Sequence, residues 1–128
     1  MNSKSTLINK FNDKSARIAI LGQGYVGLPL AMVFADSGFH VTGIDSDARK
    51  IEALNQGESY IGDIPSSTVQ KHLSAGRFAA TTDFSVLAEM DAVSICVPTP
   101  LRKTGDPDLS YILSVTQTLR DYLRPGMV

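Results

Sequence analysis

The chain has 128 residues, of which 43% are hydrophobic and 20% charged, and its formal net charge is −1. These values are typical of one globular domain, and the near-neutral charge gives no reason to expect a nucleic acid or an anionic membrane as partner. The single cysteine excludes an internal disulfide. Residues 1–16 are polar and contain no apolar stretch of signal-peptide length, so we expect a cytoplasmic protein with a flexible or loosely docked leader there.

Residues 17–128 are predicted to form one domain in which strands and helices alternate. Strands are predicted at Arg17–Leu21, residues 39–44, Phe78–Thr81 and residues 92–97, with a fifth beginning at Met127. Helices are predicted over residues 25–37 and 48–55, from Ser66 or Ser67 to Ala75, and after the caps Asp83 and Asp108 to Glu89 and Leu123. This alternation, with no hairpin signal, predicts an α/β fold: a Rossmann-type doubly wound parallel sheet in a single three-layer αβα domain.

The first predicted strand runs into a glycine-rich turn, Gly22-Gln23-Gly24-Tyr25-Val26-Gly27. In such a turn Gly22 allows the chain to reverse, Gly24 leaves room for a pyrophosphate, and Gly27 lets the next helix pack closely. The free N–H groups and the macrodipole at the helix start then favour phosphate charge. The turn therefore predicts a dinucleotide site.

Two further segments belong with this predicted site. Asp45 closes the second strand, where its carboxylate can accept hydrogen bonds from the adenosine ribose and repel a 2′-phosphate, which favours NAD over NADP. The segment from Val97 to Thr99 leaves the fourth strand beside the same crevice, and the Thr99 hydroxyl can bond a ribose or pyrophosphate oxygen. The alternative is a rigid, proline-stiffened turn with a solvent-facing threonine.

The other reactive side chains are not predicted to form a catalytic or metal site. Cys96 lies in a predicted apolar strand, so a structural role is expected. His40 and His72 lack neighbours at metal-ligand spacing and are expected at the surface, so no metal is predicted. We assign no catalytic residue within the chain.

Several motifs in order resemble the UDP-glucose/GDP-mannose dehydrogenase family. They are residues 22–31, the segment Ser59-Tyr60-Ile61-Gly62-Asp63-Ile64, and residues 97–101 with 107–111. The last two groups resemble the branch that oxidises UDP-N-acetylhexosamines, the UDP-N-acetylglucosamine 6-dehydrogenases. The resemblance implies an N-terminal NAD-binding domain of an oxidoreductase that converts C6 of the sugar to a carboxylate with two NAD, for surface polysaccharide.

The resemblance also implies roles for single residues. Val26 would contact the cofactor through its backbone, next to Tyr25 in the same turn, and Lys50 would be the basic residue beside the adenosine ribose, with Arg49 as an alternative. The family's nucleophilic cysteine and its sugar-binding domain, implied in a homo-oligomeric enzyme, correspond to sequence beyond Val128. We therefore expect this chain to bind NAD without oxidising a sugar.

Alternative functions stay open from the sequence. They are the same chemistry on UDP-glucose or GDP-mannose, a hydroxyacid dehydrogenase, which the proline loop disfavours, and a non-enzymatic module that senses NAD. The segment from Tyr60 to Ile64 either helps to shape the sugar site or is a surface loop tied down by Tyr60 and Ile61.

Overall fold

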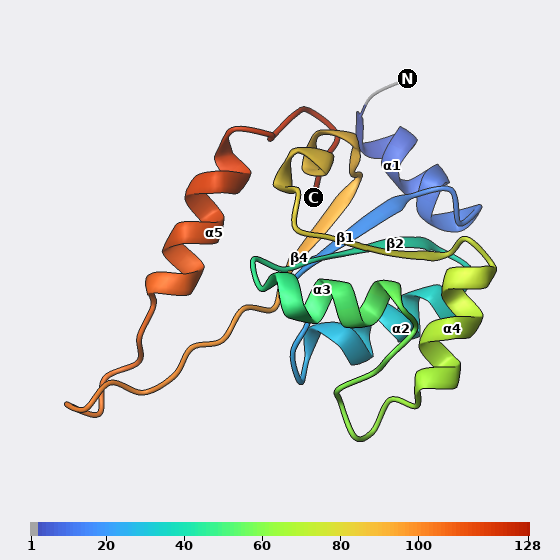
Figure 1. Cartoon of the computed structure of the whole chain (residues 1–128). Coiled ribbons are helices and arrows are strands. Elements are labelled where there is room, and N and C mark those ends of the chain that lie inside the picture. Colours follow the sequence, from blue (N-terminus) through green and yellow to red (C-terminus); the bar gives the residue numbers. More distant parts are fainter. Residues whose placement is uncertain (1–2) are drawn as a thin grey trace.

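The computed structural model describes residues 3–128 as an α/β domain built on one parallel sheet (Figure 1). The strands are β1 Arg17–Leu21, β2 His40–Ile44, β3 Phe78–Thr81 and β4 Ala92–Ile95, in the order β3-β2-β1-β4. The helices are α1 Ser3–Asn12, α2 Gly27–Asp36, α3 Ala48–Asn55, α4 Ser66–Ser74 and α5 Ser110–Arg120, with the 3₁₀-helix η1 at Phe84–Glu89. The predicted Rossmann-type fold is confirmed.

The register of the sheet places three strand ends at one edge. Leu21, the last residue of β1, lies opposite Ile44 at the end of β2 and Ile95 at the end of β4. Because all pairs are parallel, the loops that leave these strands start side by side. The predicted site residues Gly22, Asp45 and Val97 all follow within two residues of these ends.

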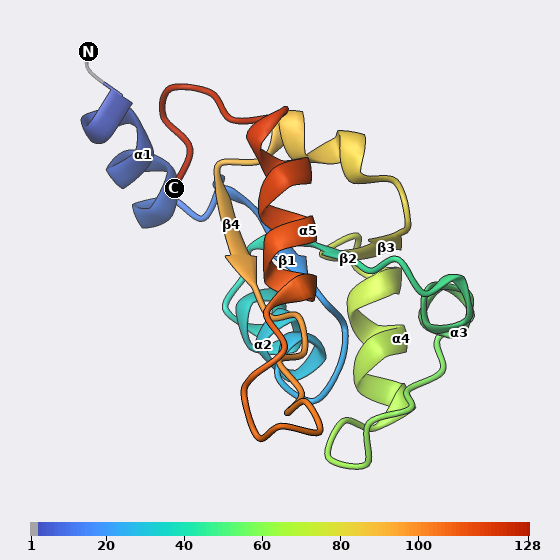
Figure 2. The ribbon, with the colours of Figure 1, turned by 90° about the vertical axis from the view of Figure 1, so that its left-hand side faces the viewer.

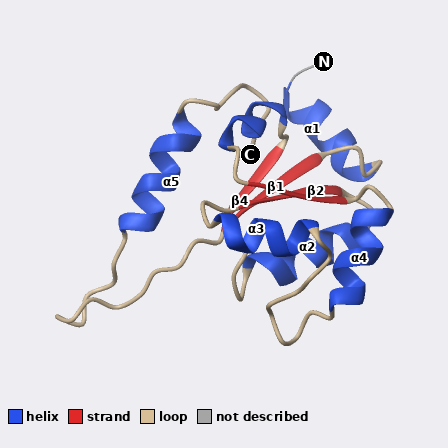
Figure 3. Cartoon of the chain, viewed as in Figure 1, coloured by secondary structure: helices blue, strands red, loops and turns tan. Residues whose placement is uncertain are grey.

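One face of the sheet carries the larger part of the core. Helices α2, α3 and α4 cover this face (Figure 3). Their buried side chains meet those of the strands, among them Ile18, Ile20 and Val41 from the sheet and Leu28, Met32, Ile51, Leu54 and Val69 from the helices. Alternation along β1 sends Ala19 and Leu21 to the other face, as expected of a strand buried on both sides.

The second face is covered by η1 and, more loosely, by α5. Leu87 and Met90 are buried there, and α5 contributes Val115 and Leu119, which are only partly buried. No residue of α5 is fully buried, and Figure 1 shows this helix standing off the sheet at the end of a long loop. Figure 2, turned by 90°, shows α5 in front of the sheet. The helix ends at Arg120, three residues before the predicted end.

Several predicted boundaries differ from the structure for physical reasons. Strand β4 ends at Ile95 and is only partly buried, because it is the edge strand of the sheet. Val128 nevertheless donates its N–H to Asp91 O and accepts from Val93 N–H, at 3.0 and 2.7 Å. Bonds to alternate residues of one strand are the pattern of a parallel neighbour, as expected where a fifth strand begins.

The N-terminal segment contains a helix that the sequence did not predict. From Ser3 onward the predicted leader forms α1, while Met1 and Asn2 lie outside the described residues. The helix has no fully buried residue, although Phe11 packs against the core. It is held by a 2.9 Å ion pair from Lys10 to Asp91 and by an edge-on contact of Phe11 with Phe39.

Two helix starts follow the predicted capping chemistry. The carboxylates of Asp47 and Asp83 accept the N–H of Arg49 and Ser85, at 3.0 and 2.9 Å. Asp108 makes the same bond to Ser110, although α5 begins one residue later than expected. These acids are therefore occupied by the backbone of their own helices.

Candidate functional site

The glycine turn between β1 and α2 is built so tightly that two of its residues have no room for a side chain. Gly22 has φ +97°, and a Cβ there would lie 2.6 Å from the carbonyl oxygen of Cys96. A Cβ on Gly27 would lie 1.7 Å from the carbonyl oxygen of Gly22. Glycine at these positions lets the start of α2 approach both the turn and the end of β4.

The opposite side of the turn is open. A Cβ on Gly24 would have no atom within 4 Å. Among the described residues, the amide N–H groups of Gly24, Tyr25 and Val26 make no hydrogen bond, and no side chain caps α2. Free amides together with the positive end of the helix macrodipole form a site suited to phosphate. The structure therefore fits a pyrophosphate here.

Asp45 faces the turn from the end of β2. Its Oδ2 accepts the Gln23 N–H and its Oδ1 accepts the Asp47 N–H, both at 2.9 Å. A carboxylate oxygen can accept two hydrogen bonds, so each oxygen keeps one acceptor position. The two backbone bonds hold the carboxylate in place, and two positions remain for a pair of ribose hydroxyls.

A cleft of two adjoining hollows follows the carboxyl edge of the sheet. The hollow over the glycine turn has a volume of about 560 Å³, and the hollow beneath α5 about 380 Å³. Both are lined by Gly22, Asp45, Lys50, Val97 and Pro98, so the two hollows adjoin at these residues. The volumes are in the range of small-molecule and cofactor sites.

The hollow over the turn brings together nearly all of the predicted cofactor residues. It is lined by Gly22, Gly24, Tyr25, Val26, Asp45, Lys50, Val97 and Thr99. Gly27 lies beneath it, at the start of α2. The Tyr25 side chain is 88% exposed and that of Val26 is also exposed, so at these two positions the backbone is the part held at the turn.

Of the two basic residues considered for the ribose, only Lys50 reaches the cleft. Arg49 lines neither hollow, and its side chain is 92% exposed with Nε 3.5 Å from Asp47. The hydrogen bond from the Arg49 N–H lowers the pKa of Asp47 and is the largest contribution to that shift. Arg49 and Lys50 are neighbours on α3, and successive residues of a helix point in different directions, so only one of them faces the cleft.

Several lining residues were not among the predicted cofactor contacts, although the sequence analysis had discussed the segments of Pro98, Tyr60 and Ile61. The 560 Å³ hollow also includes Tyr60, Ile61, Cys96 and Pro98. The hollow beneath α5 includes Tyr111, Ser114, Val115 and Thr118. The α5 residues follow an i, i+3, i+4, i+7 spacing, which marks one face of a helix and is the signal that would have found them.

The Tyr60 loop is tied to the site itself. The Tyr60 hydroxyl donates to the Gln23 carbonyl at 2.5 Å, and the Lys50 ammonium lies 6.0 Å from the centre of the Tyr60 ring. Burial raises the pKa of Tyr60, and the charges of Asp45 and Asp47 raise it further. Tyr60 does tie the loop down, and the same contact puts it in the wall of the cleft. A role of the loop in a sugar site stays a prediction.

His72 corrects one expectation about surface residues. Its side chain is 1% exposed, and Nε2 lies 2.6 Å from the Asp36 carboxylate, so it joins α4 to α2 rather than facing solvent. His40 is exposed, as expected, with Nδ1 3.1 Å from Gly76 O. Cys96 packs against the core and also contributes to the wall of the cleft.

Residues 3–128 contain no group of three or more histidine, cysteine or acidic side chains that could hold a metal ion. None of the helices in this range has the length and apolar character needed to cross a membrane.

Comparison with known proteins identifies the family. The profile described as "UDP-glucose/GDP-mannose dehydrogenase family, NAD binding domain" matches residues 16–128. The chain is 39% identical over 110 residues to GDP-mannose 6-dehydrogenase of Pseudomonas syringae pv. syringae, covering 84% of this chain and 25% of that protein. It is 34% identical over 109 residues to UDP-N-acetyl-D-mannosamine dehydrogenase of Salmonella typhi, covering 85% and 26%.

A solved structure has the same fold. NDP-N-acetyl-D-galactosaminuronic acid dehydrogenase from Methanosarcina mazei Go1 superposes with a TM-score of 0.85 at 34% identity, over 100% of this chain and 29% of that chain. The chain thus spans about a quarter of the length of the curated relatives it matches. It belongs to the UDP-glucose/GDP-mannose dehydrogenase family, and residues 16–128 are the family's NAD-binding domain.

Proposed function

We propose that this domain holds NAD along the cleft, with the pyrophosphate at the amino end of α2 and the adenosine ribose at Asp45. The observation that carries the proposal is the pairing of three unbonded amides, at Gly24, Tyr25 and Val26, with a fixed carboxylate across the same hollow. The amides suit an anion and the carboxylate suits neutral hydroxyls. A dinucleotide presents these groups next to each other.

The same geometry favours NAD over NADP. A 2′-phosphate would be placed against Asp45, whose carboxylate has no ion-pair partner among the described residues. Among the described residues Lys50 is the one cation that lines this hollow, and its single charge would offset the repulsion only in part. The backbone bonds prevent Asp45 from turning away, so the repulsion would remain.

We further propose that this domain serves a longer protein, of the length of its relatives, that oxidises C6 of a UDP-N-acetylhexosamine such as UDP-N-acetylglucosamine to the uronic acid, for surface polysaccharide. NAD, when bound, accepts the hydride at each of the two oxidation steps. Relatives named for UDP-N-acetyl-D-mannosamine support an N-acetylated sugar, and a relative named for GDP-mannose keeps that alternative in view. The domain's own residues would bind and orient the cofactor.

Sugar oxidation would need the parts that the relatives have and this chain does not span. We therefore expect the 128-residue chain to bind NAD and to form no NADH from any nucleotide sugar. In a longer form we propose a cytoplasmic homo-oligomer that binds the nucleotide sugar outside this domain. If the domain is instead an NAD-sensing module, neither the 128-residue chain nor a longer form of the protein would form NADH from a nucleotide sugar.

Calorimetric titration of the 128-residue chain tests the cofactor proposal. We expect saturable binding of NAD and at least about tenfold weaker binding of NADP, since one unfavourable charge contact costs more than about 1.4 kcal/mol in a partly buried site. Equal affinity for the two would remove the role given to Asp45, and no binding of either would remove the proposal. Turnover of the longer protein with UDP-N-acetylglucosamine, UDP-N-acetylmannosamine, UDP-glucose and GDP-mannose would identify the sugar.

A further inference from the structure

The Gln23 side chain anchors the glycine turn to the sheet. Its side chain is fully buried, and Nε2 donates to the carbonyl oxygens of Ile20 and Gly22 at 3.0 and 3.1 Å. The amide occupies space beside Gly43, where a Cβ would lie 2.5 Å from Gln23 Oε1. Strand β2 thus provides the slot in which the middle of the turn is anchored.

The backbone of Gln23 is held on both sides. Its N–H donates to Asp45 Oδ2 at 2.9 Å, and its carbonyl accepts from the Tyr60 hydroxyl at 2.5 Å. The Gln23 carbonyl belongs to the same peptide group as the Gly24 N–H. A trans peptide is planar, so its C=O and N–H point in opposite directions. A hydrogen bond that fixes the carbonyl therefore also fixes the direction of the Gly24 N–H.

The donor in this bond is itself held in place. Ser66 Oγ accepts the Ser59 N–H at 2.9 Å, and Ser59 Oγ donates to Ile61 O at 3.1 Å, so the backbone on both sides of Tyr60 is restrained. A tyrosine hydroxyl is protonated at neutral pH and can donate, and burial together with the charges of Asp45 and Asp47 raises the pKa of Tyr60 further. Tyr60 comes from a segment 37 residues away from Gln23.

We propose that Tyr60 is a positioning residue of the pyrophosphate site: by holding the Gln23 carbonyl, it aims the unbonded Gly24 N–H at the phosphates of the dinucleotide. The proposal rests on the proposed NAD site and adds to it a residue outside the glycine turn. Tyr60 acts through the peptide group and need not touch the cofactor. Its removal should weaken the phosphate contact while leaving the ribose contact of Asp45 in place.

The test is Tyr60→Phe in the 128-residue chain, measured with NAD and with adenosine, which has the ribose but no phosphate. Loss of one partly buried hydrogen bond that orients an amide should weaken NAD binding about three- to tenfold and leave adenosine binding within twofold. Tyr122→Phe is the matched control, because the Tyr122 hydroxyl makes no hydrogen bond in the described part of the chain and lines neither hollow. Amide NMR spectra of the free variants provide a second readout, in which the Gly24 signal should shift in Tyr60→Phe alone.

Each outcome decides the proposal. Weaker NAD binding, unchanged adenosine binding and a shifted Gly24 amide at an unchanged Tm support it. Unchanged NAD binding overturns it while the wild-type titration still supports the NAD site. A parallel loss for NAD and adenosine with a lowered Tm also overturns it, since Tyr60 would then act only in stability. If the wild-type chain binds no NAD, the proposed function itself has failed, independently of Tyr60.

Discussion

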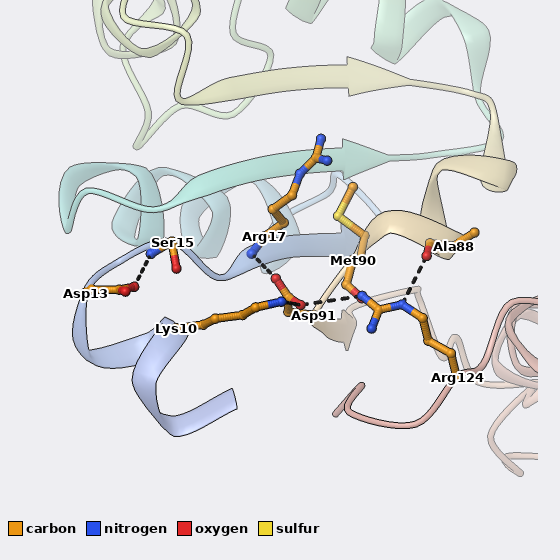
Figure 4. A network of polar contacts seen from close by, with 8 residues as sticks. All are labelled: Lys10, Asp13, Ser15, Arg17, Ala88, Met90, Asp91 and Arg124. Carbon is orange, nitrogen blue, oxygen red and sulfur yellow. Dashed lines mark hydrogen bonds and ion pairs between the residues drawn. The ribbon is translucent and has the colours of Figure 1, made fainter. Parts of the chain in front are cut away.

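Each end of the sheet has an aspartate that accepts hydrogen bonds from the backbone, but the two acids differ in their cation partners. At the amino end Asp91 accepts the Arg17 N–H and is paired with Lys10 at 2.9 Å and Arg124 at 3.4 Å (Figure 4). Its side chain is 5% exposed. At the carboxyl end Asp45 accepts two backbone N–H groups, forms no ion pair within residues 3–128 and borders the cleft.

The difference shows how the same residue type serves two purposes. The acceptor positions and charge of Asp91 are used within the fold, where they join α1, β1 and the C-terminal turn. Arg124 reinforces this by donating to the carbonyls of Met90 and Ala88 at 2.6 and 3.1 Å. Asp45 is held by bonds that leave its charge and half of its acceptor capacity available. A ligand site needs this kind of incompletely satisfied group, whereas a structural clamp needs the opposite.

The largest expected effect comes from filling the space beneath the glycine turn. Gly27→Ala would place a Cβ 1.7 Å from the Gly22 carbonyl, and we expect a loss of at least about 3 kcal/mol of unfolding free energy or failure to fold. Gly24→Ala is the matched variant, because its Cβ meets open space. It should fold normally yet bind NAD at least about tenfold more weakly. Urea unfolding measures the free energy of unfolding and calorimetry measures the NAD affinity. A stable Gly27→Ala chain would contradict the packing argument.

Asp45→Asn should break the carboxyl-edge site without disturbing the amino edge. Hydrogen bonds to a charged acceptor contribute roughly 1.5–3 kcal/mol, so the loss of charge should weaken NAD binding about ten- to hundredfold and reduce the discrimination against NADP. Calorimetric titration measures both. Asp121→Asn, at an exposed acid near Arg120 only, is the control and should bind as the wild type does. An Asp45→Asn chain with undiminished NAD affinity would rule out the role of this carboxylate.

Asp91→Asn should lower stability and leave NAD binding intact, which is the reverse of the effect expected for Asp45→Asn. The amide can still accept the Arg17 N–H but loses its attraction for Lys10 and Arg124, so we expect a loss of about 1–3 kcal/mol in unfolding free energy. NAD affinity should stay within twofold, because Asp91 lines neither cleft hollow. Thermal unfolding measures the stability of Asp91→Asn and calorimetry measures its NAD affinity. A variant with normal stability and impaired NAD binding would reverse the assignment of the two acids.

The smallest effect is a pH dependence. Burial raises the pKa of Asp91, but hydrogen bonds from the Arg17 N–H, Lys10 and Arg124 outweigh it and hold the pKa below its ordinary value. A carboxyl whose folded-state pKa is lowered stabilises the fold fully above its unfolded pKa of about 3.9, and this contribution is lost as pH falls from that value through the lower folded-state pKa. Urea unfolding between neutral pH and pH 3 should therefore show a smaller acid loss for Asp91→Asn than for the wild type. Equal pH profiles would count against this pairing.

Local signals were enough to predict the fold and most of the residues that line the cleft. Glycine spacing after β1, the acid closing β2 and the proline loop after β4 all depend on residues close together in the chain. Parallel pairing then brings those three segments to one edge whatever the details of packing. Side-chain caps at Asp47 and Asp83 are equally local, because each bond spans two residues.

Contacts between distant segments were decided by the tertiary structure alone. Tyr60 reaches Gln23 across 37 residues, Asp36 pairs with His72 across 36, and Lys10 reaches Asp91 across 81. Each depends on where two elements pack, which no local pattern encodes. The sequence by itself determined that a dinucleotide crevice forms and which strand ends border it. Only packing in three dimensions decided which side chains hold that crevice in shape, because orienting an amide or completing a buried charge needs partners from elsewhere in the chain.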